Sequence, residues 1–219
     1  MSIGARVHEQ GVTPEVRMSR STLMLKRLID VVAAATGLIV LSPVLILTAL
    51  AIRLDSRGSV VFAQVRAGLG GRPFRMYKFR TMVFKAESML EDVVALDALR
   101  EPVFKLRDDP RVTRIGRIIR RTSLDELPQL VNVLKGDMSL VGPRPEQVEL
   151  VERYTREERI RLAVKPGMTG PMQVFGRGQL TFEQRLALER DYVENLSLGR
   201  DLHILALTLP AVIAGDGAF

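Results

Sequence analysis

Residues 31–52 form a run of 22 residues without a charged side chain, which few soluble folds accommodate. About 20 apolar residues are enough for a helix to cross the hydrocarbon core of a bilayer. A secretory signal has a shorter apolar core, closer to the N-terminus, and ends in a cleavage site that this run lacks. We therefore expect the run to form a helical membrane element that stays in the mature protein.

Ser42 and Pro43 lie at the centre of this run and predict a break in the helix. Proline removes a helical hydrogen bond, and its ring crowds the carbonyl group four residues before it. Both flanks are positive, with Lys26 and Arg27 before the run and Arg53 after it. Because positive flanks favour the cytoplasmic face, a re-entrant helix–break–helix satisfies both features. A single tilted and kinked span also fits the proline.

The net charge of +7 is concentrated around the apolar run. From Lys26 to Arg80 there are nine basic and two acidic residues, so this segment accounts for the whole net charge. Basic residues beside an apolar segment favour an anionic membrane surface. A nucleic acid is disfavoured as a partner, because aromatic residues make up only 5% of the chain and tryptophan is absent.

The chain of 219 residues is long enough for one ordinary domain with an added membrane element. It has no cysteine, which excludes disulfides, thiolate nucleophiles and cysteine-bound zinc. His8 and His203 are its only histidines, and they lie too far apart in the sequence to indicate a metal cluster or a serine–histidine pair. Catalysis would therefore use carboxylates, arginines and lysines.

Outside the apolar run, the pattern predicts a mixed α/β fold that is mostly helical. Residues 60–65 and 74–79 have the character of short strands joined by a glycine-rich turn. The spacing of apolar residues predicts helices over 84–100, 147–163 and 182–196. No internal repeat is visible, so we expect one small globular domain on the membrane element.

Residues 111–121 have apolar side chains at helical spacing, and arginines are their only charged side chains. This pattern suits a helix that lies in a membrane interface, and it equally suits an ordinary amphipathic helix with solvated arginines. The apolar segment 202–214 is expected to pack on the core or to contact lipid.

The segment 120–145 places two adjacent carboxylates, Asp125 and Glu126, between arginines, with glycines and prolines after them. Ser123 and Glu126 have the spacing of a helix capping box, and Asp125 could instead be the cap. Either arrangement would explain one carboxylate in structural terms. Neither accounts for the flanking arginines.

The same residue types are suited to phosphoryl transfer. A carboxylate at a helix N-terminus is held ionised and can attack phosphorus to form an acyl phosphate. A neighbouring carboxylate can bind Mg²⁺, which neutralises diphosphate oxygens. Arg120 and Arg144 supply planar guanidinium groups that bind phosphate through two hydrogen bonds. The segment is therefore interpreted as a phosphate-handling site.

Several short motifs follow one another along the chain. They occupy residues 26–30, 42–43, 78–82, 109–113, 123–130, 142–145, 166–170, 173 and 176–177. Over residues 24–210 the chain thereby resembles bacterial sugar transferases of the monotopic phosphoglycosyl transferase kind. Members of this family move a sugar-1-phosphate from a nucleotide diphosphate sugar to a polyprenyl phosphate.

The resemblance implies a role for each candidate residue. Asp125 would be the nucleophile that takes the sugar phosphate from a UDP-sugar, releasing UMP and leaving a phosphoaspartyl enzyme. Glu126 would bind Mg²⁺ together with Asp125. Phosphate groups would be held by Arg120, Arg144, Lys78 and Arg80, and the nucleotide or sugar end by Gln173 and Arg177.

The resemblance also implies how the chain is organised. Residues 23–55 would be the re-entrant membrane helix, and 56–219 a catalytic domain on the cytoplasmic face of the bacterial inner membrane. Residues 1–22 lie outside the resemblance, and we expect a flexible leader there because they are polar, mixed in charge and unpatterned. The acceptor would be undecaprenyl phosphate in the inner leaflet. The reaction would be the first membrane step of exopolysaccharide, capsule, lipopolysaccharide or other glycoconjugate assembly, and a dimer is compatible with the sequence.

Residues 176–195 are more similar to members that handle glucose or galactose phosphates than to those that use modified amino sugars. Two other functions fit the same residues. A metal-dependent phosphatase or nucleotidyl transferase would use them without a lipid acceptor. A membrane-associated scaffold or regulator would bind anionic lipid through its basic face and would not need Asp125.

Overall fold

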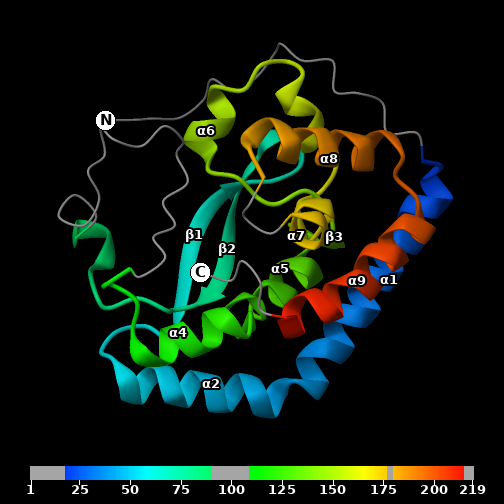
Figure 1. Cartoon of the computed structure of the whole chain (residues 1–219). Coiled ribbons are helices and arrows are strands. Elements are labelled where there is room, and N and C mark those ends of the chain that lie inside the picture. The colour runs from blue at the N-terminus through cyan, green and yellow to red at the C-terminus, as the bar shows by residue number, and fades with distance from the viewer. Residues whose placement is uncertain (1–17, 90–108, 177–179, 215–219) are drawn as a thin grey trace.

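The computed structural model describes residues 18–89, 109–176 and 180–214, and it is a mostly helical α/β structure with two small sheets (Figure 1). The elements up to residue 121 are α1 (Arg20–Val40), α2 (Ser42–Asp55), β1 (Val61–Ala67), η1 (Leu69–Gly71), β2 (Pro73–Phe79), η2 (Ala86–Met89) and α4 (Arg114–Arg121). The later elements are η4 (Leu124–Glu126), α5 (Gln129–Lys135), β3 (Ser139–Val141), α6 (Val148–Glu152), η5 (Glu158–Ala163), β4 (Gly167–Thr169), α7 (Pro171–Phe175), α8 (Phe182–Glu194) and α9 (Leu198–Ala214). The expected mixed, mostly helical fold is confirmed.

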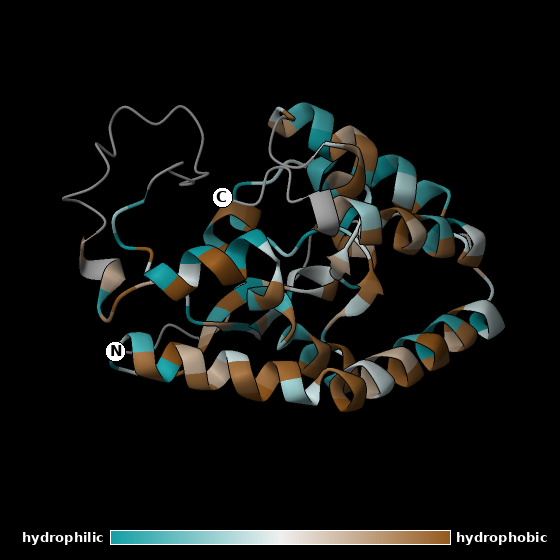
Figure 2. Cartoon of the chain, turned by 60° about the horizontal axis from the view of Figure 1, so that its bottom comes forward, coloured by the Kyte–Doolittle hydropathy of each residue, from teal (hydrophilic) through white to brown (hydrophobic). Residues whose placement is uncertain are grey.

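The apolar run is broken in the middle, as Ser42 and Pro43 predict. Helices α1 and α2 meet at Leu41 with a bend of 61°. Pro43 has no N–H group for the carbonyl of Ile39, and Ser42 Oγ donates to that oxygen instead at 2.7 Å. In the described part of the chain no single helix is long and apolar enough to cross a membrane, whereas this bent pair passes by length and composition. Figure 2 shows the apolar residues gathered along the two helices.

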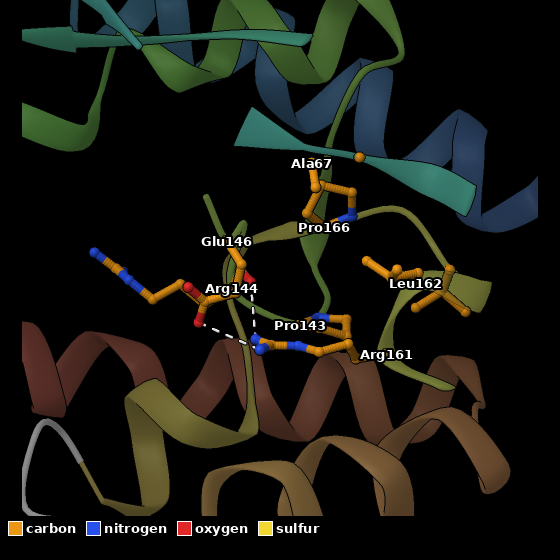
Figure 3. Close-up of a pocket in the computed structure, with 9 residues that line it drawn as sticks. Ala67, Pro143, Arg144, Glu146, Arg161, Leu162 and Pro166 are labelled. Carbon is orange, nitrogen blue, oxygen red and sulfur yellow. Dashed lines mark hydrogen bonds and ion pairs between the residues drawn. The ribbon is translucent and has the colours of Figure 1, made fainter. Parts of the chain in front are cut away.

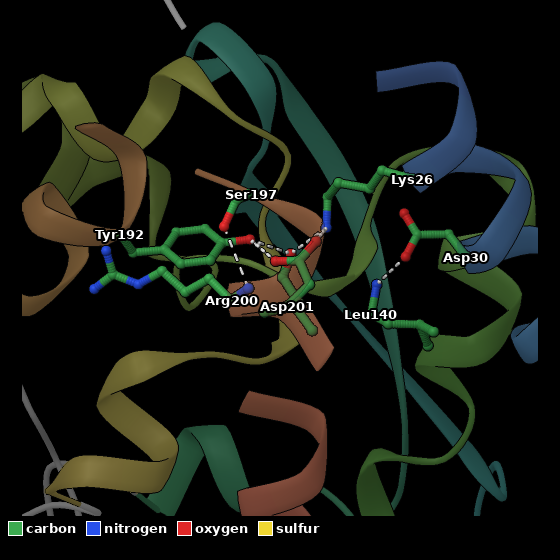
Figure 4. A network of polar contacts seen from close by, with 8 residues as sticks. Lys26, Asp30, Leu140, Tyr192, Ser197, Arg200 and Asp201 are labelled. Atoms are coloured by element: carbon green, nitrogen blue, oxygen red, sulfur yellow. Dashed lines mark hydrogen bonds and ion pairs between the residues drawn. The ribbon is translucent and has the colours of Figure 1, made fainter. Parts of the chain in front are cut away.

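The charged residues at the start of α1 bind the rest of the molecule (Figure 4). Lys26 Nζ donates to Asp201 on α9 at 2.6 Å and to the carbonyl of Val141 at the end of β3 at 3.1 Å. Asp30 accepts a hydrogen bond from the backbone N–H of Leu140 in the same strand. The first helix is therefore fixed to the strand that leads into residues 142–145.

Two further contacts hold the helix pair against the globular part. Arg27 donates to the carbonyls of Val133 and Leu134 at the end of α5, at 2.6 and 2.9 Å. At the other end of the pair, the guanidinium group of Arg80 donates to the carbonyl of Ser56 at 2.8 Å. Both ends of the bent pair thus contact the same globular body.

The predicted strands and their glycine-rich turn are confirmed. Strands β1 and β2 form an antiparallel hairpin in which Val61 pairs with Phe79 and Ala67 with Pro73. The turn needs glycine at two positions, because Gly70 and Gly71 have φ angles of 64° and 79°. Lys78, near the end of β2, is thereby placed beside η4.

The second sheet is a short parallel pair in which Ser139 opposes Gly167 and Val141 opposes Thr169. It brings two backbones into close contact beyond the end of β3. A Cβ atom at Gly167 would lie 2.1 Å from the nitrogen of Gly142, and one at Gly170 would lie 2.1 Å from the oxygen of Gly142. Because glycine has no Cβ atom, the backbone at Gly142 can contact the backbone of β4 and of Gly170 directly.

The predicted helices over 111–121 and 182–196 are confirmed as α4 and α8. A continuous helix over 147–163 is wrong, because α6 ends at Glu152 and η5 begins at Glu158. Thr155 N donates to Glu158 Oε2 at 2.6 Å, and Glu158 N donates to Thr155 Oγ1 at 3.3 Å. This reciprocal pair starts a new helical turn and separates the two segments.

For the predicted helix over 84–100, the described part contains only the short turn η2, and residues 90–100 lie outside the described residues. The predicted leader lies mostly outside them too, although α1 begins at Arg20. The apolar segment 202–214 belongs to α9, and Ile204 in this helix is fully buried against Tyr192 and Val141.

Candidate functional site

The two adjacent carboxylates lie in η4, at a sharp turn after α4. Helix α4 ends at Arg121, and Ser123 then takes a left-handed conformation with φ of 56°. Such a conformation is unusual for a residue with a side chain and is typical of functional sites. No side-chain cap forms at Ser123, so the predicted capping box is wrong, and Asp125 does not cap a helix either. The carboxylates are therefore free to face other side chains.

Glu126 lies between two basic side chains from distant parts of the sequence. Its Oε1 atom accepts hydrogen bonds from Lys78 Nζ on β2 at 2.9 Å and from Arg144 Nη2 at 3.2 Å. Burial opposes ionisation of this carboxyl group, but the charges of Lys78 and Arg144 outweigh it and hold the pKa of Glu126 well below its usual range. Glu126 is therefore ionised at neutral pH.

The pKa of Asp125 is shifted in the opposite direction to that of Glu126. Burial raises the pKa of Asp125 to about 6, and the charge of Glu126 adds to the increase, against the opposing charges of Lys78, Arg120 and Arg144. This differs from the expectation that a helix N-terminus would hold Asp125 ionised, because α5 begins only at Gln129. Two neighbouring carboxyl groups with displaced pKa values in opposite directions are typical of catalytic sites.

Arg120 is in the last turn of α4 and lies close enough to Asp125 to influence its pKa. Its Nε atom donates to Thr81 Oγ1 at 2.8 Å. The contact occupies the Nε side of the guanidinium group. Thr81, which follows β2, thereby orients the side chain of Arg120. Lys78, Arg120, Asp125, Glu126 and Arg144 are therefore brought together, as the sequence predicted.

Arg80 is placed differently from the expectation. Its guanidinium group donates to backbone carbonyls at the C-terminal end of α2, among them Ser56 at 2.8 Å and Arg57. Arginine is a common partner for the unpaired carbonyls of a helix end. Arg80 thus ties the bent pair α1–α2 to the globular part, and the structure gives it no contact with Glu126.

Gln173 lies in α7, the short helix that follows β4. Its amide nitrogen and oxygen are both buried without a hydrogen-bond partner in the described structure. A Cβ atom at Gly170 would lie 3.3 Å from Gln173 Oε1 and 2.1 Å from the oxygen of Gly142, so this amide lies close to Gly170, where the backbone passes Gly142. Arg177, the other candidate for the nucleotide or sugar end, lies outside the described residues.

The donor set at η4 is suited to magnesium only in combination with substrate oxygens. Within residues 18–89, 109–176 and 180–214, no group of three acidic or histidine side chains could hold a metal ion. Mg²⁺ commonly binds one or two carboxylates and completes its shell with phosphate oxygens and water. Asp125 and Glu126 fit that pattern, and both hydrogen bonds to Glu126 use the same oxygen, Oε1.

Two parts of the structure behind the site did not stand out in the sequence. Arg161 and Glu189 form a buried ion pair of 2.8 Å behind the backbone of Arg144. Their distance in the sequence, and the ordinary helical patterns around them, gave no signal. The motif at 109–113, by contrast, stood out in the sequence but stabilises its own segment of the chain. Asp109 and Arg111 form a buried ion pair of 2.7 Å with each other.

Residues 21–215 match a protein family described as bacterial sugar transferase. Among individual relatives, the chain is 45% identical over 199 residues to a galactosyl transferase of Streptococcus agalactiae, covering 90% of this chain and 44% of the relative. It is 44% identical over 204 residues to the undecaprenyl-phosphate galactose phosphotransferase of Salmonella typhimurium, covering 91% and 43%.

A third relative is the UDP-glucose:undecaprenyl-phosphate glucose-1-phosphate transferase of Caulobacter vibrioides. It is 45% identical over 202 residues, which cover 89% of this chain and 72% of the relative. The chain spans less than half the length of the first two relatives, at 44% and 43%.

Proposed function

Because the chain belongs to the bacterial sugar transferase family, we propose that it transfers a sugar-1-phosphate from a UDP-sugar to undecaprenyl phosphate through a phosphoaspartyl intermediate. UMP is the other product of the first step. The product on the lipid begins the assembly of an exopolysaccharide or another glycoconjugate.

One observation carries this proposal: a carboxyl group with a raised pKa stands beside three basic side chains and a second, ionised carboxylate. Asp125 is half-buried, and its pKa of about 6 leaves it mostly ionised at neutral pH. Lys78 and Arg144 approach the adjacent Glu126 at 2.9 and 3.2 Å. A diphosphate needs several positive charges close to the nucleophile, and this arrangement supplies them.

The chemistry divides into two displacements at one phosphorus atom. In the first, an Asp125 oxygen attacks the phosphorus next to the sugar, and the bond from that phosphorus to the oxygen of UMP breaks. In the second, an oxygen of the lipid phosphate attacks the same phosphorus, and Asp125 leaves with its bonding electrons. Arg120, Arg144 and Lys78 offset the negative charge of the phosphate oxygens in both steps.

Magnesium is part of the proposal. Asp125 and Glu126 would hold the ion, and it would neutralise diphosphate oxygens and stabilise the leaving phosphate. The position of Glu126 between Lys78 and Arg144 supports this role, since the three groups would share the diphosphate.

The sugar is proposed to be a hexose of the glucose or galactose type. The names of relatives that are 44% and 45% identical specify galactose and glucose phosphates, and that supports the choice. Gln173 is the candidate for reading the nucleotide or the sugar, because its buried amide has unused hydrogen-bonding atoms in the described structure.

We place the helix pair α1–α2 in the inner leaflet as a re-entrant element, with the remaining chain on the cytoplasmic face of the bacterial inner membrane. The support is that both ends of the pair are held by one globular body, through Lys26 and Arg80. The bend between the helices exposes Ile39 and Val40, which are 74% and 68% accessible. Large exposed apolar side chains at a helix bend suit contact with lipid.

Helix α4 is proposed to lie in the membrane interface beside the helix pair. Its outer side exposes Ile118, and Arg114, Arg117 and Arg121 are exposed with it. Ile119, on the inner side, is buried against Ile52 of α2. Arginines around an apolar side chain match an anionic membrane surface.

The test is UMP release by the purified full chain with magnesium, undecaprenyl phosphate and a panel of UDP-sugars. Release is expected with a UDP-hexose and is expected to fall at least about 10³-fold in Asp125→Asn, because that variant lacks the nucleophile. Glu126→Gln is expected to weaken release and to change its dependence on magnesium concentration. Normal turnover by Asp125→Asn would exclude the covalent mechanism.

The same assay separates the two alternative functions. A phosphatase or nucleotidyl transferase would act without undecaprenyl phosphate and would be insensitive to its addition. A scaffold or regulator would release no UMP from any donor, and Asp125→Asn would leave its membrane binding intact.

A further inference from the structure

Arg144 lies in a backbone segment with few hydrogen-bonding groups of its own. Its neighbours on both sides, Pro143 and Pro145, have no N–H group and restrict the backbone around them. The N–H of Arg144 is therefore the only backbone donor among residues 143–145. The guanidinium group at the other end of the residue binds Glu126.

Both backbone polar groups of Arg144 are bound by side chains from other elements. The N–H group donates to Glu189 Oε1 on α8 at 3.0 Å. The carbonyl oxygen accepts a hydrogen bond from Arg161 Nη2 on η5 at 3.1 Å. Figure 3 shows Arg161 reaching the backbone of Arg144 and the side chain of Glu146, while the side chain of Arg144 extends away from them.

Arg161 and Glu189 are buried and bound to each other, so they are themselves held in place. Glu189 is 0% exposed and Arg161 is 4% exposed, and their ion-pair distance is 2.8 Å. The second arm of the guanidinium group donates to Tyr154 Oη at 2.7 Å and to Glu146 Oε1 at 3.2 Å. Arg161 thus binds residues on both sides of Pro145 with one rigid, planar group.

The arrangement is more than support for the fold. A buried ion pair is a weak source of stability, because removing both charges from water costs about as much as their attraction returns. Here the pair is connected to the backbone of one residue, and that residue carries a charge into the candidate phosphate site. The ion pair between Arg161 and Glu189 therefore fixes the position of the Arg144 backbone.

We propose that Glu189 and Arg161 are positioning residues that fix the backbone of Arg144, so that its guanidinium group is held against Glu126 and the donor diphosphate. The inference rests on the proposed function for the identity of the diphosphate. A displacement of about 1 Å in a group that binds the reacting phosphate can lower a rate about 100-fold.

The test is a double-mutant cycle in the full chain with Glu189→Gln, Arg144→Ala and the double variant. Glutamine keeps the size of the side chain but removes the charge that holds Arg161. We expect Glu189→Gln to lower kcat/KM by about tenfold, mainly through kcat, in the chain that has Arg144. In the Arg144→Ala background the same change is expected to lower it by less than about twofold, because nothing remains to be positioned.

Asp201→Asn is the matched control. Asp201 is also a buried acid, 6% exposed, that binds a basic side chain and a tyrosine hydroxyl, but neither partner is in the candidate site. Any effect of Asp201→Asn is expected to be the same factor with Arg144 and without it. If Glu189→Gln behaves like this control, with equal factors in both backgrounds, the positioning role is wrong.

A binding measurement separates this proposal from the proposed function. Isothermal titration calorimetry with inorganic diphosphate needs no turnover, and we expect binding to weaken in Arg144→Ala and in Glu189→Gln. If no donor yields UMP but both variants weaken binding, the enzymatic function fails and the positioning role stands. If wild-type binding does not depend on Arg144, or Glu189→Gln leaves it unchanged, the positioning role fails.

Glu189→Asp provides the measurement if Glu189→Gln does not fold, as judged by circular dichroism. Aspartate keeps the charge near Arg161 but shortens the side chain by one methylene group, which moves the acceptor away from the Arg144 N–H. Arg144-dependent loss of diphosphate binding in this variant supports the proposal, and unchanged binding overturns it.

Discussion

Asp125 is stabilised in its neutral form by folding, because burial and the Glu126 charge raise its pKa to about 6. An unfolded aspartate titrates near pH 4. Between these two values the folded protein binds more protons than the unfolded chain, so stability falls as the pH rises from about 4 to about 6 and then levels off. The ionised Asp125 carboxylate therefore lowers the stability of the folded protein at neutral pH.

We expect Asp125→Asn to be more stable than the wild type at pH 7.5, by on the order of 1 kcal/mol, and to differ little at pH 4. The corresponding increase in Tm is about 3 °C, measurable by thermal denaturation in EDTA. Asp191→Asn is the control, because Arg200 lowers the pKa of Asp191 and the substitution should bring no gain at pH 7.5. Equal Tm values for Asp125→Asn and wild type at pH 7.5 would contradict the prediction.

The residues of the site differ in how well the sequence predicted them. Asp125 and Glu126 stand side by side in the chain, and Arg120 and Arg144 lie close enough to form one visible pattern. The position of Arg80 was predicted wrongly. A basic residue near an apolar run can bind the carbonyl groups at a helix end as well as a phosphate group, and the sequence does not distinguish the two.

The left-handed turn at Ser123 and the roles of Arg161 and Glu189 could not be predicted. A single φ angle depends on how α4 and η4 are packed. The pairing of Arg161 with Glu189 depends on where η5 and α8 meet in space, and 28 residues separate the two in the chain.

At the scale of elements, α4 contacts the chain after β2 through Gly116. A Cβ atom on Gly116 would lie 2.0 Å from the carbonyl oxygen of Thr81 and 2.9 Å from Thr113 Oγ1, which caps the helix. Thr81 also orients Arg120. Helix α4 can therefore pack this closely against the backbone at Thr81 only because Gly116 has no side chain.

Gly116→Ala is expected to lower the free energy of unfolding by about 2 kcal/mol or more, because backbone atoms must move to make room. Gly199→Ala is the matched control, since Gly199 lies in α9 and has nothing within 4 Å of the added Cβ. That substitution is expected to stabilise the protein by about 0.5 kcal/mol. Chemical denaturation of both variants measures the difference, and equal effects would show that Gly116 is not close-packed.

Elements with strong local signals were predicted well. The break at Pro43 and the hairpin with Gly70 and Gly71 follow from backbone chemistry that acts over a few residues. The interruption between α6 and η5 was missed although Thr155 and Glu158 carry a capping pattern, because apolar residues continue at helical spacing across it. The short strands β3 and β4 were missed because two three-residue strands depend on each other and not on their own sequences.

At the scale of the whole molecule, the contacts at both ends of the helix pair predict its topology in a membrane. The chain contains no cysteine, so single cysteines introduced at Arg20, Val40 and Arg57 are unique labelling sites. In inverted inner-membrane vesicles, a membrane-impermeant maleimide is expected to label Arg20→Cys and Arg57→Cys to the same extent. Val40→Cys, at the bend, is expected to be protected until detergent is added.

Labelling of Arg20→Cys and Arg57→Cys from opposite sides would establish a single span. A matched pair in the globular part, Glu183→Cys and Glu194→Cys, calibrates full exposure, because both positions lie on the exposed surface of α8. Equal protection of all three helix-pair positions would also contradict the re-entrant arrangement.

The ion pair between Lys26 and Asp201 has a consequence for how the protein is made. It joins residues 175 apart, so α1 leaves the ribosome long before α9 supplies its partner. Until then, Ala34 lacks the buried cluster of Met76, Leu130, Val133 and Met138 that covers it in the finished protein. The apolar helices are therefore a component of the folded core, and deleting residues 20–55 to obtain a soluble fragment would remove one wall of that core and leave an aggregating product.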